Sequence, residues 1–583
     1  MSHPYKDFEP EWFNSDFSDT SYRSVFKWGE KRRIKPPRES LYKLVKNLFN
    51  MQDDDFKKYS EDLGLDDISF DIPRKLTDAQ IAAFKEIVGD EYVRTDDYAR
   101  ASVAYGKTMY DIMRLRNHIV ENVPDAVLYP DTKEQIEKIV AYCQQEKIPV
   151  YVYGGGSSVT RGVECMKGGI SLDMRLRFNK VVDFNEIDQT ITVEAGMSGP
   201  ALEETLNNAV QNFGAKRAYT CGHFPQSFEY SSVGGWVVTR GAGQNSTYYG
   251  CISDIVIAQE YATPIGNIKT DTYPRKACGP DINQIMMGSE GTFGVLTHVT
   301  LKIFRHMPET IRRYSFMFPD WETAQAAARE IMQSEAGNPS VFRLSDPEET
   351  SIMLYLYGVM DSPLKHLFKL RGFENGKMCL FLGFTNGENG FSKNLAAHAK
   401  RVCREYGGMS LTGYVTKGWE KGRFDDPYMR DSLQDFGIVI DTMECTVNWS
   451  NMSQVHSDVR KYCKSRPNTI CMTHMSHVYP QGANLYWIFI TPMHDPAEFK
   501  AYHAGILDAI QKSGASMSHH HGIGKMFAPW LEDSLGKNEY AVIRALKEHF
   551  DPDGIMNPGG TLGLDLSEDE KITKDKKLYE DKT

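Results

Sequence analysis

The feature that most constrains this chain is a glycine-rich turn, Gly154-Gly155-Gly156-Ser157-Ser158, which directly follows a short apolar segment. Residues 149–153 read Pro-Val-Tyr-Val-Tyr, which is typical of a buried β-strand. Successive backbone N–H groups in such a turn form a concavity for an anion, because no Cβ keeps a phosphate away. Three glycines in a row also occur in plain surface loops, so the turn alone does not decide between the two. It lacks the GxGxxG spacing and therefore does not indicate a Rossmann dinucleotide site.

The length and charge of the chain limit the classes of protein it can belong to. At 583 residues it exceeds what one hydrophobic core usually supports, so we expect two or three packed domains. The 67 basic and 78 acidic residues give a net charge of −11, the wrong sign for a protein that neutralises phosphate backbones. We therefore expect no nucleic-acid partner.

Cysteine usage and targeting signals bear on the compartment. The ten cysteines are scattered without Cys-x-x-Cys pairs, which predicts neither a disulfide framework nor a structural zinc site and favours a reducing compartment. No secretory signal and no membrane-spanning apolar run is visible, so we expect a soluble, cytoplasmic protein for which contact with a membrane surface stays open. The last three residues, 581–583, do not match the peroxisomal import tripeptide, and a peroxisomal location is the alternative for a eukaryotic chain.

Changes in residue pattern divide the chain into five segments. Residues 1–100 are polar with short helical patterns at 41–51 and 78–88, and we expect a helical N-terminal extension. Strand-like and helical stretches then alternate, which predicts a mixed α/β domain over residues 101–305 and a second, substrate-covering domain over residues 306–495. The strands expected in the first domain lie at 126–129, 149–153, 169–174, 190–195 and 252–261, with a helix at 132–143. A C-terminal segment, 496–566, opens with a long helix, and residues 567–583 form a charged tail.

Three further glycine-containing segments follow the turn: residues 232–236, 278–281 and 288–297. Their order and spacing resemble the FAD-binding domain of the vanillyl-alcohol-oxidase and p-cresol-methylhydroxylase type. This resemblance implies an α+β protein in which such a domain is joined to an α+β cap domain and a helical N-terminal extension. It also implies FAD, which we expect to be bound non-covalently because no His or Cys lies between Gly154 and Gly162.

The resemblance places residues of the glycine turn, of the stretch 225–239 and of the stretch 290–295 at the FAD. They are Gly154, Gly155, Gly156, Ser157, Ser158, Pro225, Ser231, Ser232, Gly235, Trp236, Thr239, Glu290, Gly291, Gly294 and Val295.

Two longer motifs resemble a narrower family. Residues 222–229 carry Gly-His-x-Pro-x-Ser-x-Glu, and residues 518–525 read Ser-His-His-His-Gly-Ile-Gly-Lys. Both resemble the alkyldihydroxyacetonephosphate synthases, which form the ether bond of ether lipids, and the resemblance spans about residues 28–557. It implies that an acyl-dihydroxyacetonephosphate exchanges its acyl chain for a fatty alcohol through a flavin N5 adduct, with no net redox change. The implied partners are these lipid-like small molecules, and a homodimer is the assembly expected from the family.

The same resemblance assigns seven residues to catalysis. A histidine titrates near neutrality and can remove a proton next to a carbonyl group, and a tyrosine can exchange a proton with a departing or entering oxygen. The arginine fork suits a carboxylate or phosphate. The seven residues are His223, Arg343, Arg430, Tyr486, His519, His520 and His521.

Some of these residues have a purely structural alternative. In an extended run, His519 and His521 point to one face and His520 to the other, and no carboxylate or cysteine cluster lies beside them in the sequence, so we expect no metal. Tyr486 lies in an apolar segment where tyrosine often only packs, and Tyr479 is a rival for its role.

The two arginines and one aromatic stretch also have a structural alternative to a functional role. Arg343 and Arg430 can be ordinary ion-pair residues. Residues 353–357, Met-Leu-Tyr-Leu-Tyr, are expected in the core, with the lining of a lipid tunnel as the alternative.

Two departures from the synthase pattern keep a second function open. His474 and His477 do not both fit the pattern, and their roles are left undecided. Residues 555–559, Ile-Met-Asn-Pro-Gly, resemble flavin-linked lactate and glycolate dehydrogenases. Together with the missing peroxisomal signals, these points favour a prokaryotic-type relative. The alternative function is an FAD-dependent dehydrogenase or oxidase of a 2-hydroxy acid or alcohol that passes electrons to a separate acceptor.

Overall fold

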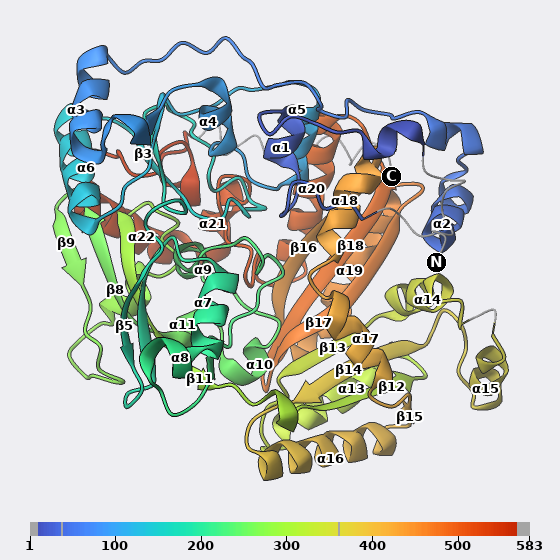
Figure 1. Cartoon of the computed structure of the whole chain (residues 1–583). Coiled ribbons are helices and arrows are strands. Elements are labelled where there is room, and N and C mark those ends of the chain that lie inside the picture. The colour runs from blue at the N-terminus through green and yellow to red at the C-terminus, as the bar shows by residue number, and fades with distance from the viewer. Residues whose placement is uncertain (1–9, 36–38, 360–361, 568–583) are drawn as a thin grey trace.

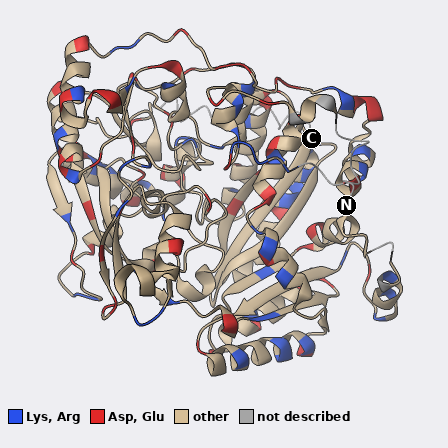
Figure 2. Ribbon diagram, in the orientation of Figure 1, with Lys and Arg blue, Asp and Glu red and all other residues tan. Residues whose placement is uncertain are grey.

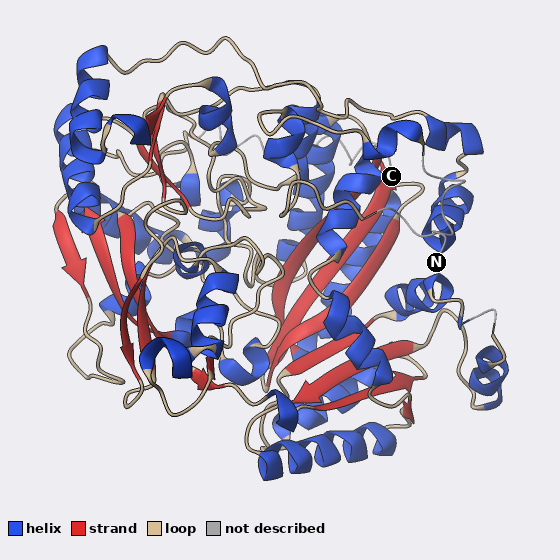
Figure 3. Cartoon of the chain, in the orientation of Figure 1, coloured by secondary structure: helices blue, strands red, loops and turns tan. Residues whose placement is uncertain are grey.

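The structure, a computed structural model, describes residues 10–35, 39–359 and 362–567. Within these ranges the chain forms β-sheets of four, five, two and seven strands. Figures 1 and 3 show two lobes: the three smaller sheets lie in one, and the seven-stranded sheet forms the other. Of the charged tail predicted for residues 567–583, all but the first residue lies outside the described ranges.

The glycine turn directly follows one edge strand of the first sheet. Its strand order is β1-β2-β4-β3, and β2 and β3 both run parallel to β4. The strands are β1 Val93–Arg94, β2 Ala126–Leu128, β3 Val150–Tyr153 and β4 Ile170–Asp173. The last three lie in the segments where the sequence predicts strands.

Part of the expected N-terminal extension belongs to this sheet. β1 pairs with β2, and helix α3 (Asp78–Val88) buries Ile81 and Phe84 in the same core as helix α6 (Lys133–Glu146). The described part of residues 1–100 consists of short helices joined by long loops, and it does not form a separate unit, because the apolar face of α3 is buried in the first domain. Its α-helices are α1 Tyr22–Phe26, α2 Glu39–Phe49, α3 Asp78–Val88 and α4 Asp97–Ser102.

The second sheet is antiparallel, in the order β5-β6-β10-β8-β9. The strand expected at 252–261 begins later, because residues 252–255 form helix α11 (Ile252–Ile255). The Asp254 carboxylate accepts the Cys251 N–H at 3.0 Å and closes its first turn. The strands are β5 Val181–Asn185, β6 Thr190–Glu194, β8 Val256–Thr263, β9 Gly266–Lys269 and β10 Val295–Lys302, and β7 Tyr219–Thr220 pairs separately with β11 Phe304–Arg305.

The seven-stranded sheet forms the second lobe, which we call the cap, in the region where the sequence predicts a substrate-covering domain over residues 306–495. All its strand pairs are antiparallel, in the order β15-β12-β14-β13-β17-β18-β16. Helices α13 (Trp321–Gln333), α16 (Asn389–Glu405) and α19 (Met452–Ser465) bury apolar side chains in its main core. The strands are β12 Arg312–Phe318, β13 Val341–Ser345, β14 Cys379–Thr385, β15 Met409–Ser410, β16 Ile438–Asn448, β17 Ile470–Tyr479 and β18 Gly482–Pro492.

The C-terminal segment links the two lobes. Helix α20 (Pro496–Lys512) packs in the cap core, and helices α21 (Ala528–Leu535) and α22 (Lys537–Phe550) follow the histidine triplet. The chain then reaches β3, where the Val150 N–H donates to the Ile555 carbonyl at 2.8 Å and the Asn557 N–H donates to the Val150 carbonyl at 2.8 Å. The chain thus returns to the strand that precedes the glycine turn.

The remaining helices are short connections around these sheets. None of the described helices is both long and apolar enough to cross a membrane. In the view of Figure 2, acidic and basic residues are interspersed along the ribbon, with several basic ones along α16. The helices are α5 Met109–Arg116, α7 Gly199–Asn207, α8 Ala209–Phe213, α9 Val233–Val238, α10 Ser246–Tyr249, α12 Ile282–Met286, α14 Pro347–Leu356, α15 Leu364–Leu370, α17 Tyr414–Gly422 and α18 Asp426–Gln434.

The aromatic stretch 353–357 divides between core and surface. Leu354 is buried in a small core cluster, whereas Tyr357 is 65% exposed. None of the five residues lines the large cavity described below. The expectation of a core position therefore holds for Leu354, and the alternative of a tunnel lining finds no support.

Candidate functional site

A cavity of about 350 Å³ lies between the first domain and the cap. Its walls come from the glycine turn, from helix α9 and its flanking loops, from strands β13, β16, β17 and β18 of the cap, and from the histidine triplet. Of the predicted cofactor residues, fourteen line it: Gly154, Gly155, Gly156, Ser157, Ser158, Pro225, Ser231, Ser232, Gly235, Trp236, Thr239, Glu290, Gly291 and Gly294. Val295 does not, because it begins β10 and is fully buried in the core of the first sheet.

The glycine turn passes too close to its neighbours to carry side chains. A Cβ on Gly155 would lie 2.2 Å from the Tyr230 carbonyl oxygen, and one on Gly154 would lie 2.3 Å from the Ser232 Oγ. The backbone itself therefore forms this wall of the cavity. A row of backbone groups unobstructed by side chains suits the pyrophosphate of FAD, so the residues present fit this cofactor.

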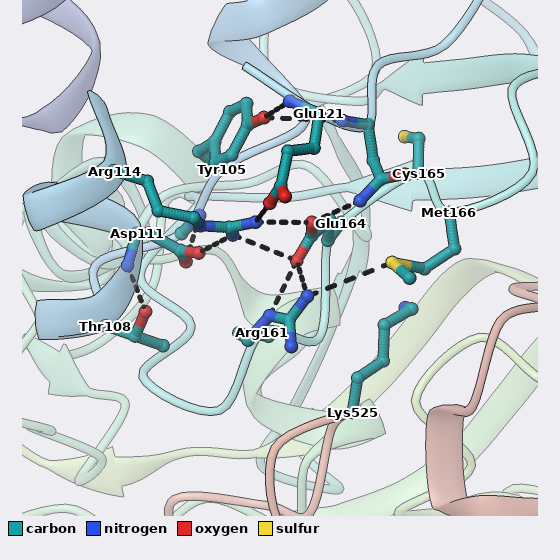
Figure 4. A network of polar contacts seen from close by, with 12 residues as sticks. Tyr105, Thr108, Asp111, Arg114, Glu121, Arg161, Glu164, Cys165, Met166 and Lys525 are labelled. Atoms are coloured by element: carbon teal, nitrogen blue, oxygen red, sulfur yellow. Dashed lines mark hydrogen bonds and ion pairs between the residues drawn. The ribbon is translucent and has the colours of Figure 1, made fainter. Parts of the chain in front are cut away.

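A buried network of charges fixes the loop that follows the turn (Figure 4). Arg114 donates to Asp111 at 2.6 Å and to both oxygens of Glu164 at 3.0 and 3.1 Å, and Arg161 donates to Glu164 at 2.6 Å. Burial alone would raise the pKa of Glu164, but Arg161 and Arg114 lower it below its usual value. The loop over residues 158–166 is thus tied to α5 by groups that are costly to separate.

A carboxylate of the first domain holds the C-terminal loop against the cavity. The Glu290 oxygens accept the N–H groups of Ile523 and Gly524, each at 2.7 Å. Lys525 donates to Asn557 at 2.9 Å and to Thr561 at 2.8 Å. These bonds place the histidine triplet at the cavity.

Glu444, in the middle of β16, organises the triplet from beneath. Its buried carboxylate accepts the backbone N–H groups of His519, His520 and His521 at 2.8 to 3.1 Å, as well as the Asn484 amide at 2.7 Å. Burial alone would raise the pKa of Glu444, but its interactions with His521 and His519 and these backbone donors lower it. Sequence reasoning missed this residue, because only the sheet places it beneath a loop 75 residues later.

The triplet does not place its three side chains alike. His520 and His521 line the cavity and His519 does not. His519 instead accepts or donates at Nε2 to the Tyr479 hydroxyl at 2.7 Å, and its Nδ1 lies 3.1 Å from Nδ1 of His520. His519 and Tyr479 therefore stand behind His520, and Tyr479 does not reach the cavity.

Tyr486, by contrast, lines the cavity from β18. Its ring lies 5.5 Å from that of His521 and 6.0 Å from that of His520, and its hydroxyl donates to the Thr442 Oγ1 at 3.0 Å. Burial raises the pKa of Tyr486 to about 12, so its hydroxyl stays protonated. Tyr486 lines the cavity and Tyr479 does not, so the geometry favours Tyr486 over Tyr479 for the catalytic role.

His474 and His477 also line the cavity. The His474 ring stacks on Tyr486 at 5.0 Å, and its Nδ1 lies 3.3 Å from the Glu349 carboxylate. The His477 ring lies 4.9 Å from that of His520, and its buried Nε2 has no hydrogen-bond partner in the protein. Both residues left undecided by the sequence therefore belong to the site.

Two arginines present unused N–H groups. Arg343 pairs with Glu349 at 2.7 Å, and the Arg430 Nη1 donates to the Lys107 carbonyl at 2.7 Å. The Nε atoms of both, and Nη2 of Arg430, are buried without a hydrogen-bond partner in the protein. Arg430 Nη2 also lies 3.6 Å from Asp431 Oδ1 in an ion pair. Both arginines line the cavity, so their Nε donors are available to a bound anion.

His223 lies outside the cavity lining. It is 1% exposed, its ring packs at 4.7 Å on Trp236, and neither ring nitrogen has a partner in the protein. Burial lowers the pKa of His223 to about 3, so it is neutral. The structure thus places His223 against Trp236 and, like His519, outside the cavity lining.

The site holds two groupings with metal-like spacing, and one of them includes a carboxylate, which the sequence did not predict beside the triplet. Ligand atoms lie within 4.8 Å of one another in the set His477, His519 and His520, and in the set Glu444, His520 and His521. A carboxylate does therefore stand beside the triplet. However, the Glu444 oxygens already accept hydrogen bonds from backbone N–H groups. Both ring nitrogens of His519 are also hydrogen-bonded, Nε2 to Tyr479 and Nδ1 to His520.

Comparisons with known proteins agree with this geometry. The profile described as "FAD binding domain" matches residues 124–272, and that described as "FAD linked oxidases, C-terminal domain" matches residues 307–561. An alkyldihydroxyacetonephosphate synthase of Dictyostelium discoideum is 30% identical over 90% of this chain and 87% of its own length.

Solved structures give the same result for the fold. An alkyldihydroxyacetonephosphate synthase has a TM-score of 0.78 and 26% identity, covering 92% of this chain and 99% of the other. A p-cresol methylhydroxylase with bound substrate has a TM-score of 0.61 at 16% identity, covering 85% and 99%.

Fold and site together define an FAD-dependent enzyme with a p-cresol-methylhydroxylase-type FAD-binding domain and an α+β cap. The expected fold class and cofactor are confirmed. Within this class, the chain belongs to the alkyldihydroxyacetonephosphate synthase family.

Proposed function

We propose that this chain exchanges the acyl chain of an acyl-dihydroxyacetonephosphate for a fatty alcohol, releasing a fatty acid and forming an ether bond. The observation that carries the proposal is the composition of one cavity. It joins the FAD turn, two arginines with unused donors and the proton-active His520 and Tyr486. A phosphate, a carbonyl-bearing carbon and a flavin thus have suitable neighbours within the same space.

The cap contributes an apolar side to this cavity. The lining there includes Val341, Phe342, Trp419, Ile440 and Ile488. A small 2-hydroxy acid has no group to place against these side chains, whereas a fatty chain does. This wall therefore favours the synthase over the oxidoreductase alternative.

Each group in the cavity has a separate role in the proposed reaction. When bound, FAD supplies an electron-poor ring that allows one C–O bond to be exchanged for another with no net oxidation. Arg343 and Arg430 bind and orient the phosphate. Burial and the neighbouring histidines lower the pKa of His520, which keeps its ring neutral and able to accept a proton beside the carbonyl. The Tyr486 hydroxyl turns its proton from Thr442 Oγ1 to the departing oxygen when the substrate is bound.

An exchange assay tests the proposal. Purified holoenzyme is given acyl-dihydroxyacetonephosphate and labelled hexadecanol, with no electron acceptor present. We expect the label in an ether product and one fatty acid released per label incorporated. A 2-hydroxy acid with an artificial acceptor serves as the comparison. Turnover of the hydroxy acid without any chain exchange would refute the proposal.

Assembly and location are part of the proposal only as predictions. A homodimer, contact with a membrane surface and a cytoplasmic location remain expectations, as does the non-covalent attachment of FAD. The fatty substrates favour an encounter with a lipid surface, since such chains partition out of water.

A further inference from the structure

A row of hydrogen-bonded side chains leads away from the cavity behind His520. His520 Nδ1 lies 3.1 Å from His519 Nδ1, His519 Nε2 lies 2.7 Å from the Tyr479 Oη, and the Tyr479 Oη lies 3.2 Å from the Cys251 Sγ. Only His520 of these four lines the cavity. Cys251 is half-buried and stands at the start of α11, beside the exposed Asp254.

Each inner member of this row can both give and receive a proton. A neutral imidazole donates at one nitrogen and accepts at the other, and a tyrosine hydroxyl and a thiol do both. The contacts use both nitrogens of His519 and, on His520, only Nδ1. The Nε2 of His520 is therefore the nitrogen left for the cavity.

We propose that His520, His519, Tyr479 and Cys251 form a proton relay that connects the substrate side of the cavity with solvent. The relay rests on the proposed function, which asks His520 to take a proton from the substrate and later return it. Of the four residues in the row, only His520 lines the cavity. His519, Tyr479 and Cys251 therefore act through His520, as positioning residues.

The direction of the bonds follows from the role of His520. To accept at Nε2, a neutral His520 must carry its proton on Nδ1 and donate it to His519 Nδ1. His519 then carries its own proton on Nε2 and donates to Tyr479, whose O–H donates to the Cys251 sulfur. Burial raises the pKa of both Tyr479 and Cys251, which keeps them neutral carriers rather than stable anions.

The proton balance closes at every member. When the N–H bond forms at His520 Nε2, the Nδ1 proton passes to His519 Nδ1, the His519 Nε2 proton passes to the Tyr479 oxygen, and the Tyr479 proton passes to sulfur. The original thiol proton leaves to water. The reverse sequence returns a proton to the substrate, so no oxidant or reductant is needed and all four groups end neutral.

Glu444 fixes the spacing of the two histidines in the row. It binds the backbone N–H groups of all three triplet residues, so the ring positions of His519 and His520 are set from the same carboxylate. A fixed spacing matters, because proton transfer falls off steeply when hydrogen bonds lengthen.

Tyr479→Phe removes the hydroxyl that joins His519 to Cys251 while keeping the ring. In the chain-exchange assay with holoenzyme we expect kcat to fall by about ten- to a hundred-fold, within the range of general acid–base contributions, with KM and bound FAD unchanged. The dependence of kcat on the D₂O fraction should change from curved, for several protons in motion, to linear. Wild-type kcat together with a curved dependence in this variant would overturn the relay.

Substitutions at the outer end provide the matched control. Cys251→Ala should lower kcat, and Cys251→Ser should restore it, because a hydroxyl can take the place of the thiol. Cys278→Ala changes an exposed cysteine and should have no effect. Equal loss in Cys251→Ala and Cys251→Ser would contradict the relay and indicate a packing role.

Neutron diffraction of deuterated holoenzyme separates the relay from the proposed function. If the wild-type enzyme exchanges no chains, the proposed function fails, and the deuteron positions still test the relay. We expect deuterons on His520 Nδ1 and His519 Nε2. A deuteron on His519 Nδ1 with none on its Nε2 would overturn the direction proposed here.

Discussion

At the scale of single residues, Asp441 faces the cavity although it belongs to none of the sequence motifs. It lies on β16, is 6% exposed and lines the cavity near Arg430. Burial raises the pKa of Asp441 from 3.8 to about 6, against the opposing effect of Arg430. Because the pKa is higher in the folded state, folding favours the protonated form of Asp441. The stability that this form provides is fully present below pH 3.8 and is lost as the pH rises through about 6.

Asp441→Asn should therefore stabilise the protein in a pH-dependent manner. We expect the free energy of unfolding to rise by up to about 3 kcal/mol at pH 8, where the wild type must bury a charge, and hardly at all at pH 4. Thermal unfolding of the holoenzyme across this pH range measures the difference. Asp183→Asn, at an exposed position on β5, is the control. A gain that is the same at both pH values would contradict this explanation.

Residues that form local motifs could be predicted, and residues placed by pairing could not. The glycine turn and the histidine triplet are contiguous, so their types and spacing carry the signal. Glu444 and Asp441 lie in an 11-residue strand, β16, that reads as ordinary β-structure. Which of its side chains lie under the triplet depends on strand register, which a single sequence does not encode.

At the scale of elements, one irregularity explains why His474 and His477 both reach the cavity. Strict alternation would send residues three apart to opposite faces of β17. A register shift between Ser476 and Val478 leaves His477 as an extra residue, with a φ of 48°. This β-bulge turns His477 to the same side as His474, and no sequence signal marks it.

The glycine turn makes a prediction at this scale. Gly155→Ala should prevent FAD binding, because its Cβ would lie 2.2 Å from the Tyr230 carbonyl oxygen. The Cβ has no rotatable bond to move it away, and the oxygen belongs to the backbone. We expect a colourless protein with wild-type circular dichroism, measured after incubation with excess FAD. Gly418→Ala, on α17 with no heavy atom within 4 Å of the added Cβ, should bind FAD normally. Full flavin content in Gly155→Ala would show that the turn does not hold the cofactor.

At the scale of the whole molecule, the site exists only where three distant parts of the chain meet. The first domain supplies the turn and Glu290, the cap supplies the arginines and Tyr486, and the C-terminal loop supplies the triplet. The sequence indicated this order of parts through resemblance. It did not show that β1 and α3 of the N-terminal extension are built into the first domain, because buried apolar contacts between distant segments have no local pattern.

In the proposed function, this assembly uses FAD to exchange two chains without consuming electrons. The visible flavin spectrum, followed under anaerobic conditions while the holoenzyme turns over acyl-dihydroxyacetonephosphate and fatty alcohol, shows whether it does. We expect many turnovers per flavin, fatty acid and ether product in equal amounts, and fully oxidised flavin when the substrates are exhausted. A single turnover that leaves the flavin reduced, and that continues only when an electron acceptor is added, would contradict it.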